Sequence, residues 1–249
     1  MLINETRSKL VQLKLFGMAE GIDSQLATSR ASELSFEERL GLLVDYEITS
    51  RENRRLKTLL RIAKLKIAAD LNDLHYSPNR NLNRTKIANL STCNWITQGF
   101  NVLITGPTGT GKTYLACALG QQSCLKGFTV QFHKIGLLLD DLEQAAIDGS
   151  YRKRLTYINR SSLLILDDLG IKARLKPNEC EHLLDLIDGR HGVGSMIVTS
   201  QLPQNKWHEY LNASYPTTAD AIMDRLLTNA TKFELKGESL RPHKDVLAE

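Results

Sequence analysis

The chain has 249 residues, 42% of them hydrophobic and 24% charged, with a formal net charge of +4 at pH 7. This composition is typical of a globular protein that buries its own core, and it excludes a disordered or fibrous chain. The four cysteines form no CxxC pair and show no ligand spacing with the six histidines, so we expect reduced thiols and no Cys/His metal site. No secretory signal and no run of about 18 apolar residues is present, which predicts a cytoplasmic protein without a membrane partner.

The positive charge is unevenly distributed along the chain. Residues 1–95 hold 15 Lys/Arg and 11 Asp/Glu, whereas residues 96–249 hold 17 of each kind. The whole basic excess therefore lies in the N-terminal part. This asymmetry indicates an anionic partner for that part.

The first 95 residues are predicted to be helical. Residues 2–15 and 18–27 have helical patterns, with Gly17 as an interruption between them. Ser35 and Glu38 then have the spacing of a capping box, which opens a helix with an apolar stripe. Polar residues 49–53 break that stripe, and it resumes between residues 56 and 67.

Six basic residues lie opposite the resumed stripe on a helical wheel: Arg51, Arg54, Arg55, Lys57, Arg61 and Lys64. A solvated helix face has the same pattern. However, six cations with only Glu52 among them exceed what solubility requires and suit contacts to the phosphates of duplex DNA. We therefore predict a helical DNA-binding domain over residues 1–69, followed over residues 70–98 by a linker with a short helix at its end.

Residues 99–249 have a different pattern, in which strands alternate with helices. Such alternation predicts an α/β domain with a parallel sheet covered on both faces. We place five strands near residues 102–105, 128–133, 162–167, 195–199 and 230–235. Two helices are predicted between the second and third strands, over residues 135–147 and 151–159.

A glycine-rich loop follows the first of these strands and precedes a helical segment. Residues 104–113, ITGPTGTGKT, fit the pattern GxxxxGK[ST]. In this pattern glycines let successive backbone N–H groups point at a phosphate, a lysine reaches the outer phosphates, and a hydroxyl ligates Mg²⁺. The predicted nucleotide-binding residues are Gly106, Pro107, Thr108, Gly109, Thr110, Gly111, Lys112, Thr113 and Tyr114.

Two later strands end in polar side chains. Residues 161–170, SSLLILDDLG, predict a buried strand that delivers Asp167 to Mg²⁺ beside Thr113, and places Asp168 to orient or deprotonate a water. A core strand ending in a polar turn looks similar, but its place after the loop favours the metal site. Residues 195–201, SMIVTSQ, end beside the loop, where Thr199, Ser200 or Gln201 could touch the γ-phosphate, although many strand ends are polar without a catalytic role.

This order of motifs resembles the AAA+ ATPases of the replication initiator and helicase-loader clade. Within that clade the chain is similar to the IstB-like ATPases, which are transposition helpers of bacterial insertion sequences. The resemblance covers nearly the whole chain and includes SFEERLGLLVDYE (35–47), RENRRL (51–56), LITGPTGTGKTYLACALGQ (103–121), LLILDDLG (163–170) and ADAIMDRLLTNATKFELKGESLR (219–241).

The resemblance implies a role for several residues. Residues 106–113 match Walker A, Asp167 and Asp168 match Walker B, and Ser200 with its neighbours matches sensor 1. Arg225 matches an arginine finger that acts on the neighbouring subunit, although an arginine paired with Asp220 or Asp224 on a surface helix would look the same. Arg190 is a second candidate for contact between subunits, and Arg241 resembles a sensor 2 arginine. The implied catalytic residues are Lys112, Asp168, Ser200 and Arg225.

The chain departs from the AAA+ pattern at two points. Asp168 stands where many AAA+ proteins have Glu, which puts the efficiency of hydrolysis in doubt. Few residues follow Arg241, so we expect an AAA+ core without the C-terminal helical lid. In addition, Trp207 and His208 follow Asn205 and Lys206, so the Asp of the guanine-specifying motif NKxD is missing and we expect ATP with Mg²⁺ as the ligand.

The function that the resemblance implies is an ATP-dependent helper of transposition in the bacterial cytoplasm. Such a protein forms homo-oligomers on target duplex DNA with ATP sites between subunits, recruits or stimulates a partner transposase, and is reset by slow, DNA-stimulated hydrolysis. The alternative within the clade is a DnaC-like helicase loader. A monomeric P-loop kinase and a nucleotide-gated binding module with negligible turnover are alternatives from other classes. Assembly in ATP and stimulation by DNA would distinguish the kinase from the helper.

Overall fold

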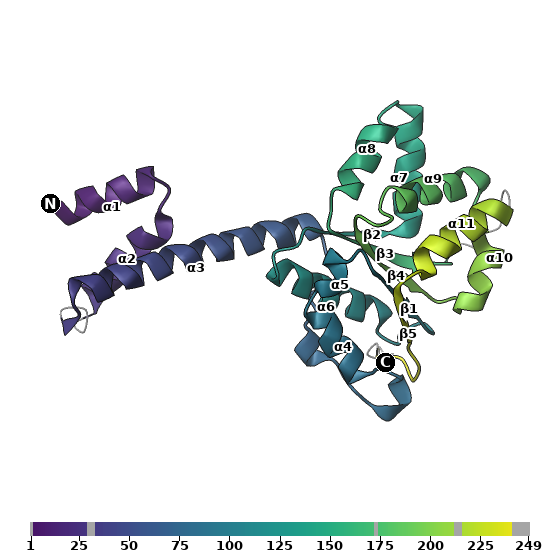
Figure 1. Cartoon of the computed structure of the whole chain (residues 1–249), viewed down its shortest axis with the longest axis horizontal. Helices are drawn as coiled ribbons and strands as arrows, with labels where there is room; N and C mark the ends of the chain where they lie inside the picture. Colours follow the sequence, from purple (N-terminus) through teal and green to yellow (C-terminus); the bar gives the residue numbers. More distant parts are fainter. Residues whose placement is uncertain (1, 29–32, 172–173, 212–215, 241–249) are drawn as a thin grey trace, which may run out of the picture. The chain divides into compact units, whose positions relative to one another are not determined.

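The computed structural model describes residues 2–28, 33–171, 174–211 and 216–240 (Figure 1). The chain divides between Thr58 and Leu59 into two compact units. We describe each unit separately. The assignment of residues 1–69 as a DNA-binding domain stays a prediction.

The first unit contains α1 (Leu2–Gln12), α2 (Phe16–Ala27) and most of α3 (Phe36–Ala63). The predicted interruption at Gly17 is wrong, because the chain turns earlier, at Lys14, whose φ is 61°. Gly17 lies inside α2, where an added Cβ would come within 2.4 Å of the Tyr46 carbonyl oxygen. Gly17 therefore permits the close approach of α2 to α3.

The capping box at the start of α3 is confirmed. The Ser35 amide donates to Glu38 Oε2 at 2.8 Å, and the Glu38 amide donates to Ser35 Oγ at 3.3 Å. The helix then runs unbroken through residues 49–53 and ends at Ala63. Lys64, with a φ of 48°, ends it, so Ile67 lies beyond the helix that its apolar spacing predicted.

The second unit is built on a parallel sheet in which all five predicted strands are confirmed. The order is β2-β3-β4-β1-β5, and every neighbouring pair is parallel. The strands are β1 (Asn101–Thr105), β2 (Val130–Lys134), β3 (Leu163–Leu169), β4 (Ser195–Ser200) and β5 (Ala230–Glu234). Every residue of β1 and β4 is buried, as expected for central strands covered on both faces.

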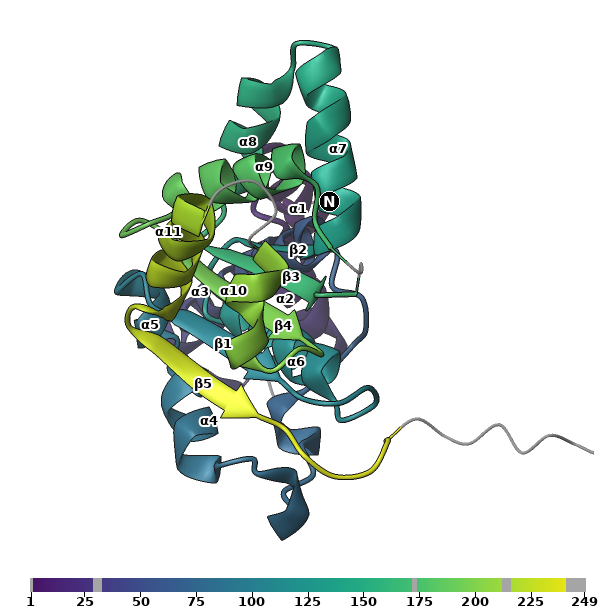
Figure 2. The same cartoon turned by 90° about the vertical axis from the view of Figure 1, so that its right-hand side faces the viewer.

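Helices cover both faces of this sheet, which agrees with the α/β prediction (Figures 1 and 2). One face carries α6 (Lys112–Leu125), with α4 (Arg84–Ser91) and α5 (Asn94–Thr97). The other face carries α7 (Ile135–Ile147), α8 (Tyr151–Asn159), α9 (Pro177–Asp188), α10 (Trp207–Leu211) and α11 (Pro216–Leu227). Helices α7 and α8 have the predicted bounds. Between β5 and residue 240 the described chain contains no helix.

The segment predicted as a linker with a short helix is part of the second unit. It contains two 3₁₀ turns, η2 (Leu71–Asp73) and η3 (Pro78–Arg80), followed by α4 and α5. Ile87, Leu90 and Trp95 are buried, so this segment packs against the core. Of the helices within the described ranges, none is long and apolar enough to cross a membrane.

Candidate nucleotide-binding site

The glycine-rich loop joins the C-terminal end of β1 to the N-terminus of α6. Gly106, Gly109 and Gly111 have positive φ values of 149°, 84° and 91°. A Cβ on Gly106 would lie 2.3 Å from the Leu235 carbonyl oxygen, so this position accepts only glycine in the present structure. Helix α6 begins at Lys112 with Gly111 as its N-cap. The loop therefore forms an anion site at the N-terminus of a helix of 14 residues.

Lys112 is the first residue of α6, and its side chain packs against the loop, so the residue is only 6% exposed. Its ammonium donates to the carbonyl oxygens of Gly106 and Pro107, each at 2.7 Å. These bonds hold the charge where the outer phosphates of a nucleotide lie in a loop of this kind.

Asp167 lies at the end of β3, and its side chain is fully buried. Its Oδ1 accepts hydrogen bonds from Thr113 Oγ1 at 2.8 Å and from Thr199 Oγ1 at 2.7 Å, while Lys66 Nζ lies 3.4 Å from Oδ2. A carboxylate beside a threonine hydroxyl is an oxygen donor pair that fits Mg²⁺. No cluster of three or more His, Cys, Asp or Glu side chains in the described ranges could hold a metal ion. When bound, Mg²⁺ would take its remaining ligands from nucleotide phosphates and water.

Asp168 follows in a left-handed backbone conformation with a φ of 71°, which Asn and Asp adopt more readily than other side chains. Its amide donates to Thr199 Oγ1 at 3.0 Å. The residue lines a cavity of about 380 Å³ together with Thr108, Lys112 and Gln201. A carboxylate in that cavity faces the loop, which is the position that a group acting on a water requires.

The three polar residues at the end of β4 point in different directions. The Ser200 hydroxyl is fully buried; it donates to the Leu169 carbonyl oxygen at 2.7 Å and accepts from the Leu202 amide at 3.0 Å. Thr199 instead contacts Asp167, and Gln201 Oε1 accepts from Thr108 Oγ1 at 2.8 Å. The geometry therefore directs Thr199 and Gln201 toward the loop, while the Ser200 side chain joins the ends of β3 and β4.

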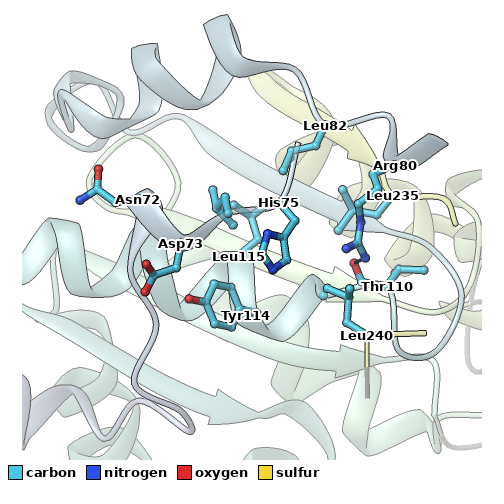
Figure 3. A pocket seen from close by; sticks show the side chains of 12 residues that line it. Asn72, Asp73, His75, Arg80, Leu82, Thr110, Tyr114, Leu115, Leu235 and Leu240 are labelled. Atoms are coloured by element: carbon cyan, nitrogen blue, oxygen red, sulfur yellow. Dashed lines mark hydrogen bonds between the residues drawn. The ribbon is translucent and has the colours of Figure 1, made fainter. Parts of the chain in front are cut away.

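A second cavity, of about 690 Å³, adjoins the loop on its other side (Figure 3). Gly111, Tyr114 and Leu240 line both cavities, so the two cavities are adjacent. Figure 3 shows His75 beside Tyr114, and the Arg80 guanidinium turned toward Thr110, whose carbonyl oxygen it contacts at 3.1 Å. These residues belong to no recognisable motif, because the segment 71–82 lies next to the loop only after folding.

The two candidate arginines, Arg190 and Arg225, lie near the N-terminal ends of the central strands and differ in exposure. Arg225 forms an ion pair with Asp188, rather than with Asp220 or Asp224, and is about one-third exposed. Arg190 is 1% exposed, and its guanidinium donates to the carbonyl oxygens of Ser161 and Ser195, both at 2.9 Å. Burial lowers the pKa of Arg190 to about 10. The prediction that Arg190 contacts a neighbouring subunit is therefore wrong.

Arg225 also lies far from the loop of its own chain. The Asn101 side chain, at the start of β1, donates to the Arg225 carbonyl oxygen at 3.1 Å. The loop follows the other end of β1, and at about 3.3 Å per residue the strand separates the two by roughly 13 Å. Arg241, the predicted sensor 2 residue, lies outside the described residues.

In the first unit, two of the predicted DNA-binding residues contact a buried acid. Arg51 Nε donates to Glu47 Oε1 at 2.6 Å, and Arg54 Nη2 lies 3.5 Å from the same atom. Glu47 Oε2 accepts from the Gly17 amide at 2.7 Å, which caps α2. Burial acts to raise the pKa of Glu47, but the hydrogen bonds from Arg51 and the α2 amides lower it below its ordinary value. Arg51 and Arg54 thus stabilise the contact between α2 and α3.

The other four predicted DNA-binding residues are exposed. Arg55 and Lys57 belong to the first unit, and Arg61 and Lys64 to the second. Contact of any of these residues with DNA stays a prediction.

The parallel sheet, the loop at the N-terminus of α6 and the carboxylate at the end of β3 define a P-loop nucleotide-binding protein with the AAA+ core fold. The profile of the family described as IstB-like ATP binding protein matches residues 8–248. The chain belongs to this family.

Several relatives are similar over most of the chain. An insertion sequence ATP-binding protein of Sinorhizobium fredii is 42% identical over 241 residues, which is 97% of this chain and 96% of the relative. One of Pseudomonas fluorescens is 44% identical over 206 residues, or 82% of this chain and 89% of the relative.

The solved structures that are similar support the fold. The structure of DnaI is 20% identical and covers 75% of this chain and all of its own, with a TM-score of 0.59. That of the DnaC helicase loader is 22% identical, covers 68% of this chain and 97% of its own, and has a TM-score of 0.55.

Proposed function

We propose that this protein is an ATP-dependent helper of transposition that hydrolyses ATP, assembles on duplex DNA and recruits or stimulates a partner transposase. The observation that carries the proposal is the cluster of Lys112, Thr113 and Asp167 at the loop. The insertion sequence context comes from the names of the relatives.

In the proposed reaction, the loop amides and Lys112 bind the phosphates, and Thr113 with Asp167 would hold Mg²⁺. The metal, when bound, would neutralise charge on the β- and γ-phosphates. Asp168 orients the attacking water and accepts its proton, while Gln201 or Thr199 positions the terminal phosphate or that water. Gln201 suits this role best, because the hydroxyl of Ser200 is engaged at Leu169 and Leu202 and that of Thr199 is engaged at Asp167 and Asp168.

The proposal includes hydrolysis at the interface between subunits. Arg225 is separated from its own loop by the length of β1 and is partly exposed. If Arg225 stabilises the transition state, it therefore does so in a neighbouring subunit, which makes the active form a homo-oligomer. In that form Arg225 exchanges its ion pair with Asp188 for the γ-phosphate of the neighbour.

DNA binding is assigned to the exposed cations of α3 and the residue that follows it. Arg55, Lys57, Arg61 and Lys64 suit contacts to the phosphate backbone, which carry affinity without sequence preference. We assign Arg51 and Arg54 a mixed role, because both also neutralise Glu47. The proposed place of action is the bacterial cytoplasm.

Electron microscopy of the purified protein, with and without ATP and duplex DNA, tests the assembly directly. We expect rings or filaments on DNA that require ATP, together with Mg²⁺-dependent hydrolysis stimulated by DNA. Particles of single-subunit size under all conditions would contradict the proposal and favour a monomeric phosphotransferase.

A helicase loader is the second candidate, because DnaI and the DnaC helicase loader share this fold. The two functions differ in the protein partner. Co-purification with the transposase encoded beside this chain, and not with the replicative helicase of the host, is expected for the transposition helper. The opposite result would favour the loader.

A further inference from the structure

Lys66 places a second ammonium group in the candidate nucleotide site, although no motif includes it. The residue follows the end of α3 by three positions and belongs to the second unit. Its Nζ lies 3.4 Å from Asp167 Oδ2, and it lines the same cavity as Lys112, Thr113 and Asp168.

The backbone around Lys66 is held against the helix that starts in the loop. Leu65 and Ala69 pack against Cys117 and Ala118 of α6. The Asp70 amide donates to the Tyr114 hydroxyl at 3.3 Å. The side chain of Lys66, in contrast, is 39% exposed, so it can rotate while its backbone stays fixed beside the loop.

The contact between Lys66 and Asp167 can exist only while no other cation occupies that side of the carboxylate. Oδ1 of Asp167 accepts two hydroxyl hydrogen bonds, and Oδ2 has the Lys66 ammonium. A Mg²⁺ ion held by Asp167 and Thr113 would bring two positive charges to within a few ångströms of that ammonium. Repulsion would move the ammonium away, and the terminal phosphate, which carries more negative charge than the Asp168 carboxylate in the same cavity, would attract it most strongly.

We infer that Lys66 is a second phosphate-binding lysine, which neutralises Asp167 in the nucleotide-free protein and moves to the terminal phosphate when a magnesium nucleoside triphosphate binds. The residue then favours a triphosphate over a diphosphate, because only the triphosphate supplies the anion at that place. The inference rests on the proposed ATP binding, and it extends that site to a residue outside the loop.

The test compares the affinities of the full-length protein for fluorescent ATP and ADP analogues at saturating Mg²⁺. Lys66→Gln should weaken ATP binding about tenfold and change ADP binding little, because a partly exposed charge-assisted contact to the γ-phosphate is lost. Lys66→Arg, which keeps the charge, should retain most of the preference for ATP. Lys126→Gln is the matched control, since it removes the same charge at the opposite end of α6.

Three results would overturn the inference. If Lys66→Gln weakens the binding of ATP and of ADP equally, the role of Lys66 is limited to the neutralisation of Asp167. If both affinities are unchanged, Lys66 has no role at the phosphates. Loss of the ATP preference in Lys66→Arg, with thermal unfolding like that of the wild type, would also contradict it. If the wild-type protein does not bind ATP at all, the proposed function itself is refuted, and this result differs from the three that refute only the role of Lys66.

Discussion

Lys112→Ala is the substitution that tests the nucleotide site most directly. The ammonium is almost fully buried and makes two hydrogen bonds of 2.7 Å inside the loop. In the ATP complex the same group would contact the outer phosphates, and a hydrogen bond involving a charged group contributes about 1.5–3 kcal/mol. Loss of two such contacts corresponds to about 3 kcal/mol or more, so we expect ATP affinity to fall at least about a hundredfold.

The same substitution should lower the stability of the nucleotide-free protein by a smaller amount. Without the ammonium, the carbonyl oxygens of Gly106 and Pro107 each lose a hydrogen bond. At about 1 kcal/mol for each lost bond, the free energy of unfolding should fall by about 2 kcal/mol. For a domain of this size that corresponds to a decrease in Tm of roughly 4–8 °C.

Isothermal titration with ATP and Mg²⁺ measures the first effect, and thermal unfolding without nucleotide measures the second. Lys126→Ala, at the far end of α6, should leave both quantities unchanged. A Lys112→Ala protein that melts at a lower temperature but binds ATP within about twofold of the wild type would refute the reasoning, because the lysine would then only stabilise the empty loop.

Replacing Arg55 and Lys57 with Gln should weaken binding to every duplex sequence alike and flatten the log–log salt dependence by about 0.9 for each lost phosphate contact. Unchanged affinity and slope would leave both residues on a solvated face. Arg225→Ala should bind ATP but lose hydrolysis by on the order of a thousandfold. Mixing it with Asp168→Asn should restore some activity, and mixed oligomers without recovery would argue against catalysis between subunits. Asp168→Asn alone should bind ATP, fail to hydrolyse it and stay longer on DNA in a competitor chase. Release from DNA at the wild-type rate would contradict a link between the nucleotide state and DNA binding.

Much of the fold follows from local sequence patterns. Three of the five strands, β1, β3 and β4, are predictable because they are short apolar runs that end at polar residues, as buried parallel strands do. The loop was predictable because the residues that define it, including its glycines and Lys112, lie within ten consecutive positions of the sequence. Gly17 was misassigned, since the same residue that interrupts a helix by propensity also permits close packing of two helices, and only tertiary contacts decide between these roles.

The parts of the site that the sequence did not predict depend on contacts between distant segments. Ser200 and Gln201 are neighbours in sequence, but the pleat of β4 turns the first toward Leu169 and leaves the second beside Thr108. Lys66 and Asp167 are 101 residues apart. His75 and Arg80 come from a polar segment that resembles a linker until it packs beside the loop. The polar residues 199–201 have a local signal as a strand end, but the direction of each side chain and the places of Lys66, His75 and Arg80 do not.

The contrast between Arg190 and Arg225 shows why residue type alone does not indicate which arginine could act on another subunit. Arg190 donates to several backbone carbonyl oxygens in a buried environment, so its withdrawal would leave those groups unsatisfied at a cost of several kcal/mol. Arg225 has a partly exposed ion pair with Asp188, and pairs of this kind contribute about 0–1 kcal/mol. Exchange of that carboxylate for a phosphate of a neighbouring subunit would therefore cost little. Of these two arginines, only Arg225 combines a position far from its own loop with a side chain that can be released.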